Sequence, residues 1–305
     1  MNRRSFLSAS TILMHQSLSW AQVKPSNKPK SSESLLVLTT NDVHSQIEPF
    51  SAKDSRFPNM GGFARRSFAV NALRKQYPNV LLLDSGDVFQ GSPYFNYYKG
   101  ALEYSLMKEM GYNAGTLGNH DFDLGLENLA LQLPLAQFPM VCSNYEFKNT
   151  VLDQHPQIRP FIVLEKGPFK IGLYGLGVNL NTLLPDSIHN SIVYHDPLER
   201  AQYWEAYLHH TEQCHLILCL SHLGYQYSDE RISDIRLAQA LKYTHYIAGG
   251  HTHTFLDKPV LVQNASRNYT IISQQGWGGV WMGALEFSMH KKSIFSDFRH
   301  SKLVL

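Results

Sequence analysis

The sequence predicts a single α/β domain built on mixed rather than purely parallel β-structure. Apolar runs of strand length, at 35–40, 80–83 and 215–220, alternate with segments whose apolar residues recur at helical spacing. At 160–176 two apolar runs flank a Lys-Gly-Pro turn, which indicates an antiparallel hairpin in the same fold. Because no internal repeat and no second linker interrupts this alternation, we expect one domain over 35–305.

The individual elements follow from this alternation and from residues that start or stop helices. Gly61 and Gly62 open the first helical segment, Gly111 ends the second, and Asp196 is an N-cap for the fourth. The predicted helices are, in chain order, 63–73, 97–110, 124–132, 197–213 and 229–242. The predicted strands and strand-like runs are 35–40, 80–83, 112–117, 139–143, 160–165, 169–176, 215–220, 245–248, 269–273, 282–289 and 293–299.

Composition is that of a globular protein with a sizeable core. Hydrophobic residues make up 43% of the 305 residues and charged residues 17%, which excludes a disordered chain. The formal net charge of +2 is too close to neutral for nucleic acid or a membrane surface to be the main partner. Histidine is the unusual component, with 15 copies.

The first 34 residues precede the predicted domain. Arg3 and Arg4 lie ahead of an apolar stretch, and 19–21 form a small-x-small cleavage site, so we expect an export signal over 1–21. The paired arginines resemble a twin-arginine signal, with an ordinary secretory signal or an uncleaved anchor as alternatives. The apolar stretch is too polar for stable membrane insertion. Residues 22–34, rich in Ser, Lys and Pro, indicate a linker. We therefore predict a periplasmic or extracellular protein.

The three cysteines, Cys142, Cys214 and Cys219, are too few and odd in number for a disulfide framework. Their spacing is not that of a metal site. Cys214 and Cys219 flank a strand and are expected to be small buried residues, with a redox pair as the alternative.

Short polar motifs follow the predicted strands and offer ligands for metal ions. Carboxylate, amide and imidazole groups without thiolate suit Zn, Mn, Fe, Co or Ni. A pair of cations about 3.5–4 Å apart needs a bridging carboxylate, and Asp87 is the best candidate because it follows a tight turn beyond a core strand. The candidate ligands are Asp42, His44, Asp87, Asn119, His222, His251 and His253.

These motifs, in this order, resemble the calcineurin-like metallophosphoesterases. Asp-x-His, Gly-Asp, Gly-Asn-His-Asp and Gly-His-Thr-His are all present. Within that family the segments 61–65, 86–91 and 119–123 are similar to the catalytic domain of bacterial 5′-nucleotidase and UDP-sugar hydrolase. The resemblance extends from about residue 35 to the C-terminus. It implies the metallophosphoesterase fold, in which mixed sheets pack as a sandwich flanked by helices.

The resemblance also implies a role for each motif residue. One divalent ion is held by Asp42, His44 and His253, the other by Asn119, His222 and His251, with Asp87 between them. His120 contacts the phosphoryl oxygens and stabilises the transition state, and Asp123 orients His120 through a hydrogen bond. A metal-bridging hydroxide then attacks phosphorus in line, without a covalent intermediate.

The implied substrate is a small phosphorylated molecule, a nucleotide or a related phosphomonoester. Cyclic-nucleotide phosphodiesterase, UDP-sugar hydrolase and thiosulfohydrolase activities remain alternatives on the same ligand set. The 5′-nucleotidases carry a second, base-stacking domain, whereas this chain ends soon after Gly283. We therefore expect either a separate nucleotide-binding protein or a loosely chosen substrate. An accessory metal-binding subunit is the second hypothesis.

Other polar and aromatic residues near these motifs receive structural interpretations. Asp84 is expected to form a turn, and Asp121 to be a helix-start carboxylate. The aromatic group Tyr94, Phe95, Tyr97 and Tyr98 is expected to pack in the core or at the rim. Trp277 and Trp281 are expected to lie in or beside a glycine-rich loop near the site.

Overall fold

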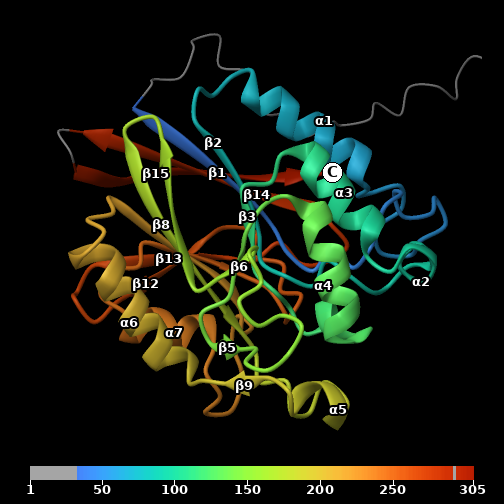
Figure 1. The fold of residues 1–305 in the computed structure, drawn as a ribbon. Coiled ribbons are helices and arrows are strands. Elements are labelled where there is room, and N and C mark those ends of the chain that lie inside the picture. Colours follow the sequence, from blue (N-terminus) through green and yellow to red (C-terminus); the bar gives the residue numbers. More distant parts are fainter. Residues whose placement is uncertain (1–32, 291–292) are drawn as a thin grey trace, which may run out of the picture.

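The computed structural model describes residues 33–290 and 293–305 as two β-sheets packed face to face, with helices on both outer faces (Figure 1). The predicted export signal, and the linker except for residues 33 and 34, lie outside the described residues. The arrangement is the predicted α/β sandwich of mixed sheets.

The first sheet has the strand order β15-β14-β1-β2-β3-β4-β6. Its five parallel strands are β1 (Ser34–Thr40), β2 (Val80–Asp84), β3 (Ala114–Gly115), β4 (Met140–Val141) and β6 (Ile158–Arg159). The long hairpin of β14 (Trp281–His290) and β15 (Ser293–Val304) adds antiparallel to β1. The parallel strands therefore all end at the same edge of the sheet.

The second sheet has the order β12-β13-β11-β10-β8-β7. Its parallel centre consists of β8 (Phe169–Gly177), β10 (Leu216–His222), β11 (Tyr246–Gly249) and β13 (Tyr269–Ser273). The edge strands β7 (Phe161–Lys166) and β12 (Val260–Gln263) are antiparallel, and β7 forms the predicted hairpin with β8. A separate small sheet pairs β5 (Tyr145–Glu146) with β9 (Val193–Tyr194).

The helices divide between the two outer faces. Helices α1 (Phe63–Arg74), α2 (Pro93–Tyr98), α3 (Ala101–Met110) and α4 (Gly125–Ala136) lie on the first sheet's side, with η1 (His120–Phe122) before α4. Helices α6 (Pro197–His210) and α7 (Asp234–Ala240) cover the second sheet, and α5 (Asp186–His189) lies apart from them (Figure 1). Asp196 caps α6 as predicted, accepting a hydrogen bond from the Glu199 amide.

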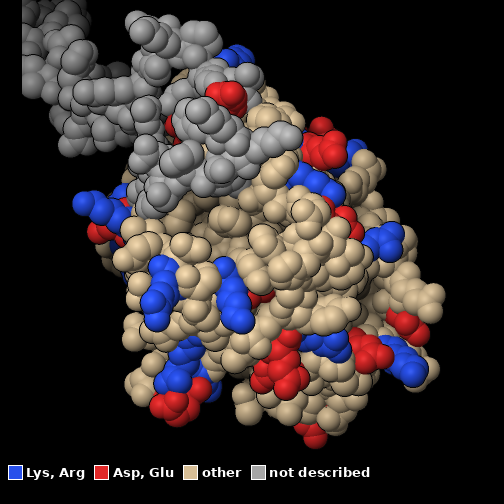
Figure 2. All heavy atoms as spheres, turned by 90° about the vertical axis from the view of Figure 1, so that its left-hand side faces the viewer, with Lys and Arg blue, Asp and Glu red and all other residues tan. Residues whose placement is uncertain are grey.

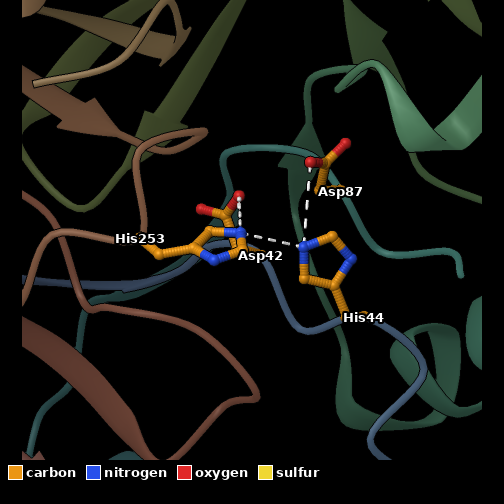
Figure 3. Close-up of side chains that lie close together, drawn as sticks. All are labelled: Asp42, His44, Asp87 and His253. Carbon is orange, nitrogen blue, oxygen red and sulfur yellow. Dashed lines mark hydrogen bonds and ion pairs between the residues drawn. The ribbon is translucent and has the colours of Figure 1, made fainter. Parts of the chain in front are cut away.

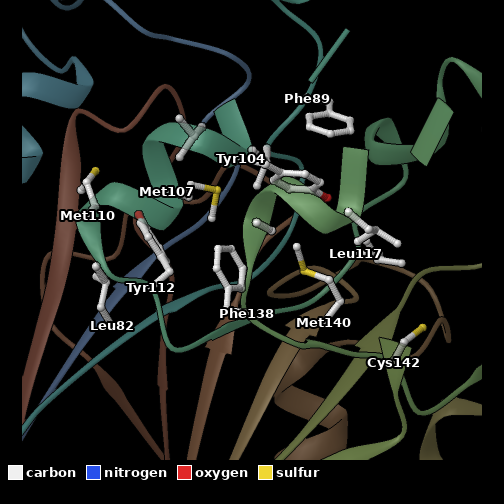
Figure 4. Close-up of a cluster of buried hydrophobic side chains, with 14 of the residues drawn as sticks. Leu82, Phe89, Tyr104, Met107, Met110, Tyr112, Leu117, Phe138, Met140 and Cys142 are labelled. Carbon is white, nitrogen blue, oxygen red and sulfur yellow. The ribbon is translucent and has the colours of Figure 1, made fainter. Parts of the chain in front are cut away.

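Strand β1 shows why the sheets pack as a sandwich. Its apolar residues alternate, as the two-residue period of a strand requires. Leu36 and Leu38 face the helices in a cluster that includes Tyr104 and Met107 of α3 (Figure 4). Leu35 and Val37 instead join the cluster between the two sheets. Because both faces are covered, β1 is buried throughout, with an apolar centre from Leu35 to Leu38.

Two predicted helices differ from the structure. The helix expected over 97–110 is two helices, because Lys99 and Gly100 both have positive φ, 56° and 103°. A Cβ on Gly100 would lie 2.2 Å from the Phe89 ring, so this close approach requires glycine. The helix expected over 229–242 is only α7, and it begins where Ser233 caps the Arg236 amide. Strand β12 was not predicted.

Charge and sulfur chemistry agree with the composition. On the face seen in Figure 2, acidic and basic side chains are interspersed rather than gathered by sign. Among the described helices, none has the length and apolar character needed to cross a bilayer. The three cysteines are free and buried, which confirms the burial predicted for Cys214 and Cys219.

Candidate metal centre

The predicted ligands meet where the carboxyl ends of the parallel strands of both sheets come together. Asp42 and His44 follow β1, Asp87 follows β2 and Asn119 follows β3, all in the first sheet. The second sheet contributes three histidines: His222 is the last residue of β10, and His251 and His253 follow β11.

The first cluster consists of Asp42, His44, Asp87 and His253 (Figure 3), and one ligand atom from each lies within 4.8 Å of the others. The Nε2 atoms of His44 and His253 are 3.0 Å apart. Nε2 of His253 is 3.4 Å from Oδ1 of Asp42, and Nε2 of His44 is 3.8 Å from Oδ2 of Asp87. Two imidazole nitrogens and two carboxylates that converge in this way match the donor set of a first-row divalent ion.

The second cluster consists of Asp87, His222 and His251, and it satisfies the same distance limit. Nε2 of His222 lies 3.1 Å from Oδ2 of Asp87, so one carboxylate belongs to both clusters. Nε2 of His222 and Oδ1 of Asn119 are buried, and neither makes a hydrogen bond within the described residues. Since buried polar atoms normally have partners, these two atoms fit a role as metal ligands.

Backbone carbonyls fix which nitrogen of two histidines faces the cluster. Nδ1 of His44 lies 3.2 Å from the Phe89 carbonyl oxygen, and Nδ1 of His222 lies 2.7 Å from that of Ser85. A proton on each Nδ1 donates to these carbonyls, which leaves the lone pair of Nε2 for a cation.

Five of the seven candidate ligands have positive φ: Asp42, His44, Asp87, His251 and His253, at 48–72°. This left-handed conformation costs non-glycine residues about 1–3 kcal/mol each and concentrates at functional sites. Two glycines make the crowding possible. A Cβ on Gly118 would lie 2.2 Å from Oδ1 of Asp87, and one on Gly250 would lie 2.9 Å from Nδ1 of His222.

Comparison with known proteins identifies the architecture. Residues 35–255 match the model of the calcineurin-like phosphoesterase family. The chain belongs to this family. A crystal structure of the 5′-nucleotidase precursor from Thermus thermophilus superimposes with a TM-score of 0.80 at 30% identity, covering 89% of this chain and 54% of that one.

Two curated relatives are similar over most of this chain. The 5′-nucleotidase of Homo sapiens is 35% identical over 73% of this chain and 38% of its own length. The trifunctional nucleotide phosphoesterase protein YfkN of Bacillus subtilis (strain 168) is 29% identical over 89% of this chain and 19% of its own length. The calcineurin-like phosphoesterase domain thus corresponds to a part of each relative.

Asp121 of this phosphoesterase is a carboxylate in the first turn of η1, as the sequence indicated, but it also has a role that the sequence did not indicate. It is buried, with Oδ1 accepting hydrogen bonds from the amides of Val88 and Phe89 and Oδ2 from those of Asp87 and Gly118. Burial, with the nearby Asp87 carboxylate, raises the pKa of Asp121 to about 7. Asp121 therefore ties the loop that carries Asp87 to the loop that carries Asn119.

His120 and Asp123 lie beside the clusters. Nδ1 of His120 is 2.9 Å from Oδ2 of Asp123, and this hydrogen bond raises the pKa of His120 although partial burial opposes it. The His120 amide donates to Oδ1 of Asp87 at 2.8 Å, and the ring lies edge-on to His44 with centroids 5.3 Å apart. In this chain the imidazole of His120 is thus held in position next to the first cluster.

Charges within the centre are strongly coupled when no metal is bound. Burial alone would lower the pKa of His222, but the Asp87 carboxylate outweighs it and raises this pKa to about 10. Burial would raise the pKa of Asp87, and His222 instead holds it below its usual value. Burial lowers the pKa of His251 to about 4. The centre therefore balances its carboxylates with positive charge, as a metal ion would.

The aromatic residues have separate positions. Trp277 is stacked against His253, with centroids 6.0 Å apart, and it packs edge-on against Phe50. Phe95 is buried against Phe89, whereas Tyr97 is 79% exposed. Asp84 accepts a hydrogen bond from the Gly86 amide, which is the turn that its sequence position indicated.

Proposed function

We propose that this domain is an exported, metal-dependent phosphomonoesterase that hydrolyses nucleotides, the activity that the name of its 5′-nucleotidase relatives describes. The observation that carries the proposal is the position of Asp87, whose carboxylate is shared by two clusters of histidine and carboxylate ligands. The similarity to the human and Thermus thermophilus proteins supports the choice of nucleotides.

The residues present fit two divalent ions. Asp42, His44 and His253 would hold one, and Asn119, His222 and His251 the other, with Asp87 common to both. When bound, the ions would supply an oxygen nucleophile at neutral pH and counter the negative charge on the phosphoryl group. The unpartnered, buried Oδ1 of Asn119 supports this assignment, as does Nε2 of His222, which faces the shared Asp87 carboxylate.

His120 would act on the phosphoryl group directly. Its Nδ1 is held by Asp123, so a proton on Nε2 can be presented to a phosphoryl oxygen as charge develops there. Asp123 keeps the ring in this orientation. The amide of His120 is occupied by Asp87, so the imidazole and the shared carboxylate are fixed relative to each other.

A substrate panel tests the proposal. The purified protein is loaded with Mn²⁺ and offered AMP, UDP-glucose, cyclic AMP and glycerol 3-phosphate, before and after chelator. We expect chelator-sensitive release of phosphate, fastest from AMP. Preference for UDP-glucose or cyclic AMP would replace the nucleotidase assignment. No turnover of any substrate by the loaded protein would favour an accessory metal-binding role.

Export rests on the sequence of residues 1–21, with Arg3 and Arg4 ahead of an apolar stretch. Expression of the full chain in a bacterium with a twin-arginine pathway, followed by cell fractionation, tests it. We expect periplasmic protein from the natural sequence and cytoplasmic retention after R3K and R4K together. An unchanged distribution would contradict the twin-arginine route.

A further inference from the structure

A cavity of about 850 Å³ lies beside the second metal cluster. Its walls come from the chain after β8, the start of α6, the loop after β10 and the end of α7. These elements lie together in the lower part of Figure 1, near α5 and β9. The volume is in the range of about 300–1,000 Å³ that small-molecule sites occupy.

The cavity reaches the centre through His251. Among the seven candidate ligands His251 alone lines it, and Leu223, the residue after His222, forms the adjoining wall. A phosphoryl group held between the two clusters would therefore have this hollow directly beside it. The group to which the phosphate is attached would occupy this cavity.

The residues that line the cavity determine which kind of chemical group can bind there. The cavity is lined by apolar side chains such as Leu198 and Ile232, by the rings of Tyr194 and Tyr227, and by exposed carboxamides such as Asn181. Apolar and aromatic walls with a few polar groups suit a flat ring that has hydrogen-bonding edges.

The charges in and around the cavity nearly cancel, with Asp196, which caps α6, as one additional carboxylate. Arg231 pairs with Asp229 at 2.9 Å and stacks on the ring of Tyr227, with its guanidinium carbon 4.1 Å from the ring centroid. Arg236 pairs with Glu230 at 2.6 Å. Because both guanidinium groups already have carboxylate partners, the cavity offers little attraction to a second phosphate. It favours a neutral group.

We propose that this cavity binds the nucleoside half of the substrate, so that the catalytic domain itself recognises the group that carries the phosphate. The inference rests on the proposed phosphomonoesterase function. It assigns nucleoside recognition to residues 178–240 rather than to the aromatic side of the centre around Trp277, where His253 already occupies one face of the indole.

Filling the cavity tests the inference. Leu183 lines it and is 42% exposed, so Leu183→Trp adds bulk without disturbing the core. We expect the KM for AMP to rise about ten-fold or more, with kcat and bound metal unchanged, and the kinetics with glycerol 3-phosphate to stay the same. Leu131→Trp, at a 71% exposed position on α4, is the matched control and should alter neither substrate.

Asn181→Ala is a milder variant, since it removes an exposed carboxamide and leaves packing intact. It should raise the KM for AMP several-fold and again spare glycerol 3-phosphate. If Leu183→Trp and Asn181→Ala affect both substrates equally, or neither, the inference is wrong. It is also wrong if Trp277→Ala, and not the cavity variants, removes the preference for AMP.

Binding of adenosine, measured by titration calorimetry, separates this inference from the proposed function because it needs no turnover. Adenosine bound by the natural protein and lost in Leu183→Trp supports the cavity even if no phosphomonoester is hydrolysed. Hydrolysis of AMP with no adenosine binding and no effect of the cavity variants on KM overturns the cavity and leaves the phosphoesterase intact.

Discussion

The loops of the two sheets build the metal centre in different ways. The first-sheet loops are held by buried acceptors of their own sheet, chiefly Asp121, which receives four backbone N–H groups. The second-sheet loop around His251 is instead held by a residue of the first sheet. The His251 amide donates to both carboxylate oxygens of Asp42 at 3.0 Å. The first-sheet half is preorganised, and the second-sheet half is assembled on it.

Exposure follows the same division only in part. His222, at the end of β10, has a fully buried side chain, whereas that of His253 is 40% exposed. Gln274 supports the exposed loop, with its carboxamide nitrogen donating to the Gly250 carbonyl at 2.6 Å and its oxygen accepting from the Thr254 amide. Substitutions in the first-sheet loops should therefore weaken binding at both metal positions, whereas substitutions in the second-sheet loops should affect only the nearer one.

The largest effect is expected at the carboxylate that both halves share. Asp87→Asn removes one negative charge from both clusters, so we expect loss of both ions and a fall in kcat/KM of at least about a thousand-fold. Elemental analysis of the purified variant measures the metal directly. Retention of two ions at full occupancy would contradict a bridging role for Asp87.

Asp121→Asn tests whether preorganisation of the first-sheet half matters by itself. A neutral amide turns its NH2 toward backbone N–H groups, which leaves buried donors unpaired and costs about 2–4 kcal/mol of unfolding free energy. We also expect weaker binding of both ions, although Asp121 belongs to neither cluster. The control is Asp186→Asn, at a position whose side chain is 93% exposed. Equal effects of the two substitutions would show that the four hydrogen bonds are unimportant.

His120→Ala should separate rate from metal content. The ring lies beside the first cluster but belongs to neither, so we expect two bound ions and a kcat lowered about 10²–10⁴-fold. Asp123→Ala should lower kcat less, since the imidazole remains. Elemental analysis alongside steady-state kinetics decides the matter. Loss of metal from His120→Ala would mean that this residue is a ligand.

The smallest effect concerns acid stability in the second sheet. Burial lowers the pKa of His245, just before β11, to about 4, and its Nδ1 accepts a hydrogen bond from the Ile217 amide. Below about pH 6.5 His245 is protonated in the unfolded chain but stays neutral in the folded protein. The free energy of unfolding therefore falls from pH 6.5 toward pH 4. In His245→Asn this part of the slope should vanish. Urea titrations of both proteins at several pH values measure the difference, and parallel curves would contradict it.

Much of the fold could be read from local patterns. Strands β1, β2 and β10 are buried throughout because both faces are covered, and the length of the apolar run in each is enough to predict a strand. The break between α2 and α3 could not be predicted from the sequence, because it depends on the close approach of Gly100 to the ring of Phe89. The helix expected over 229–242 likewise begins only at Asp234, and Glu230, Arg231 and Ile232 before it line the cavity.

The sequence by itself determined the inventory of the centre, since residue type and position after a strand mark each of the seven candidate ligands. Tertiary structure decided how they are used. Asp121 sits in a helix-start context, yet it bonds to amides more than thirty positions away, and no local pattern records that contact. The cavity beside His251 likewise exists only because segments far apart in the chain meet there. Local sequence carries side-chain chemistry, whereas distances between loops depend on how two sheets pack.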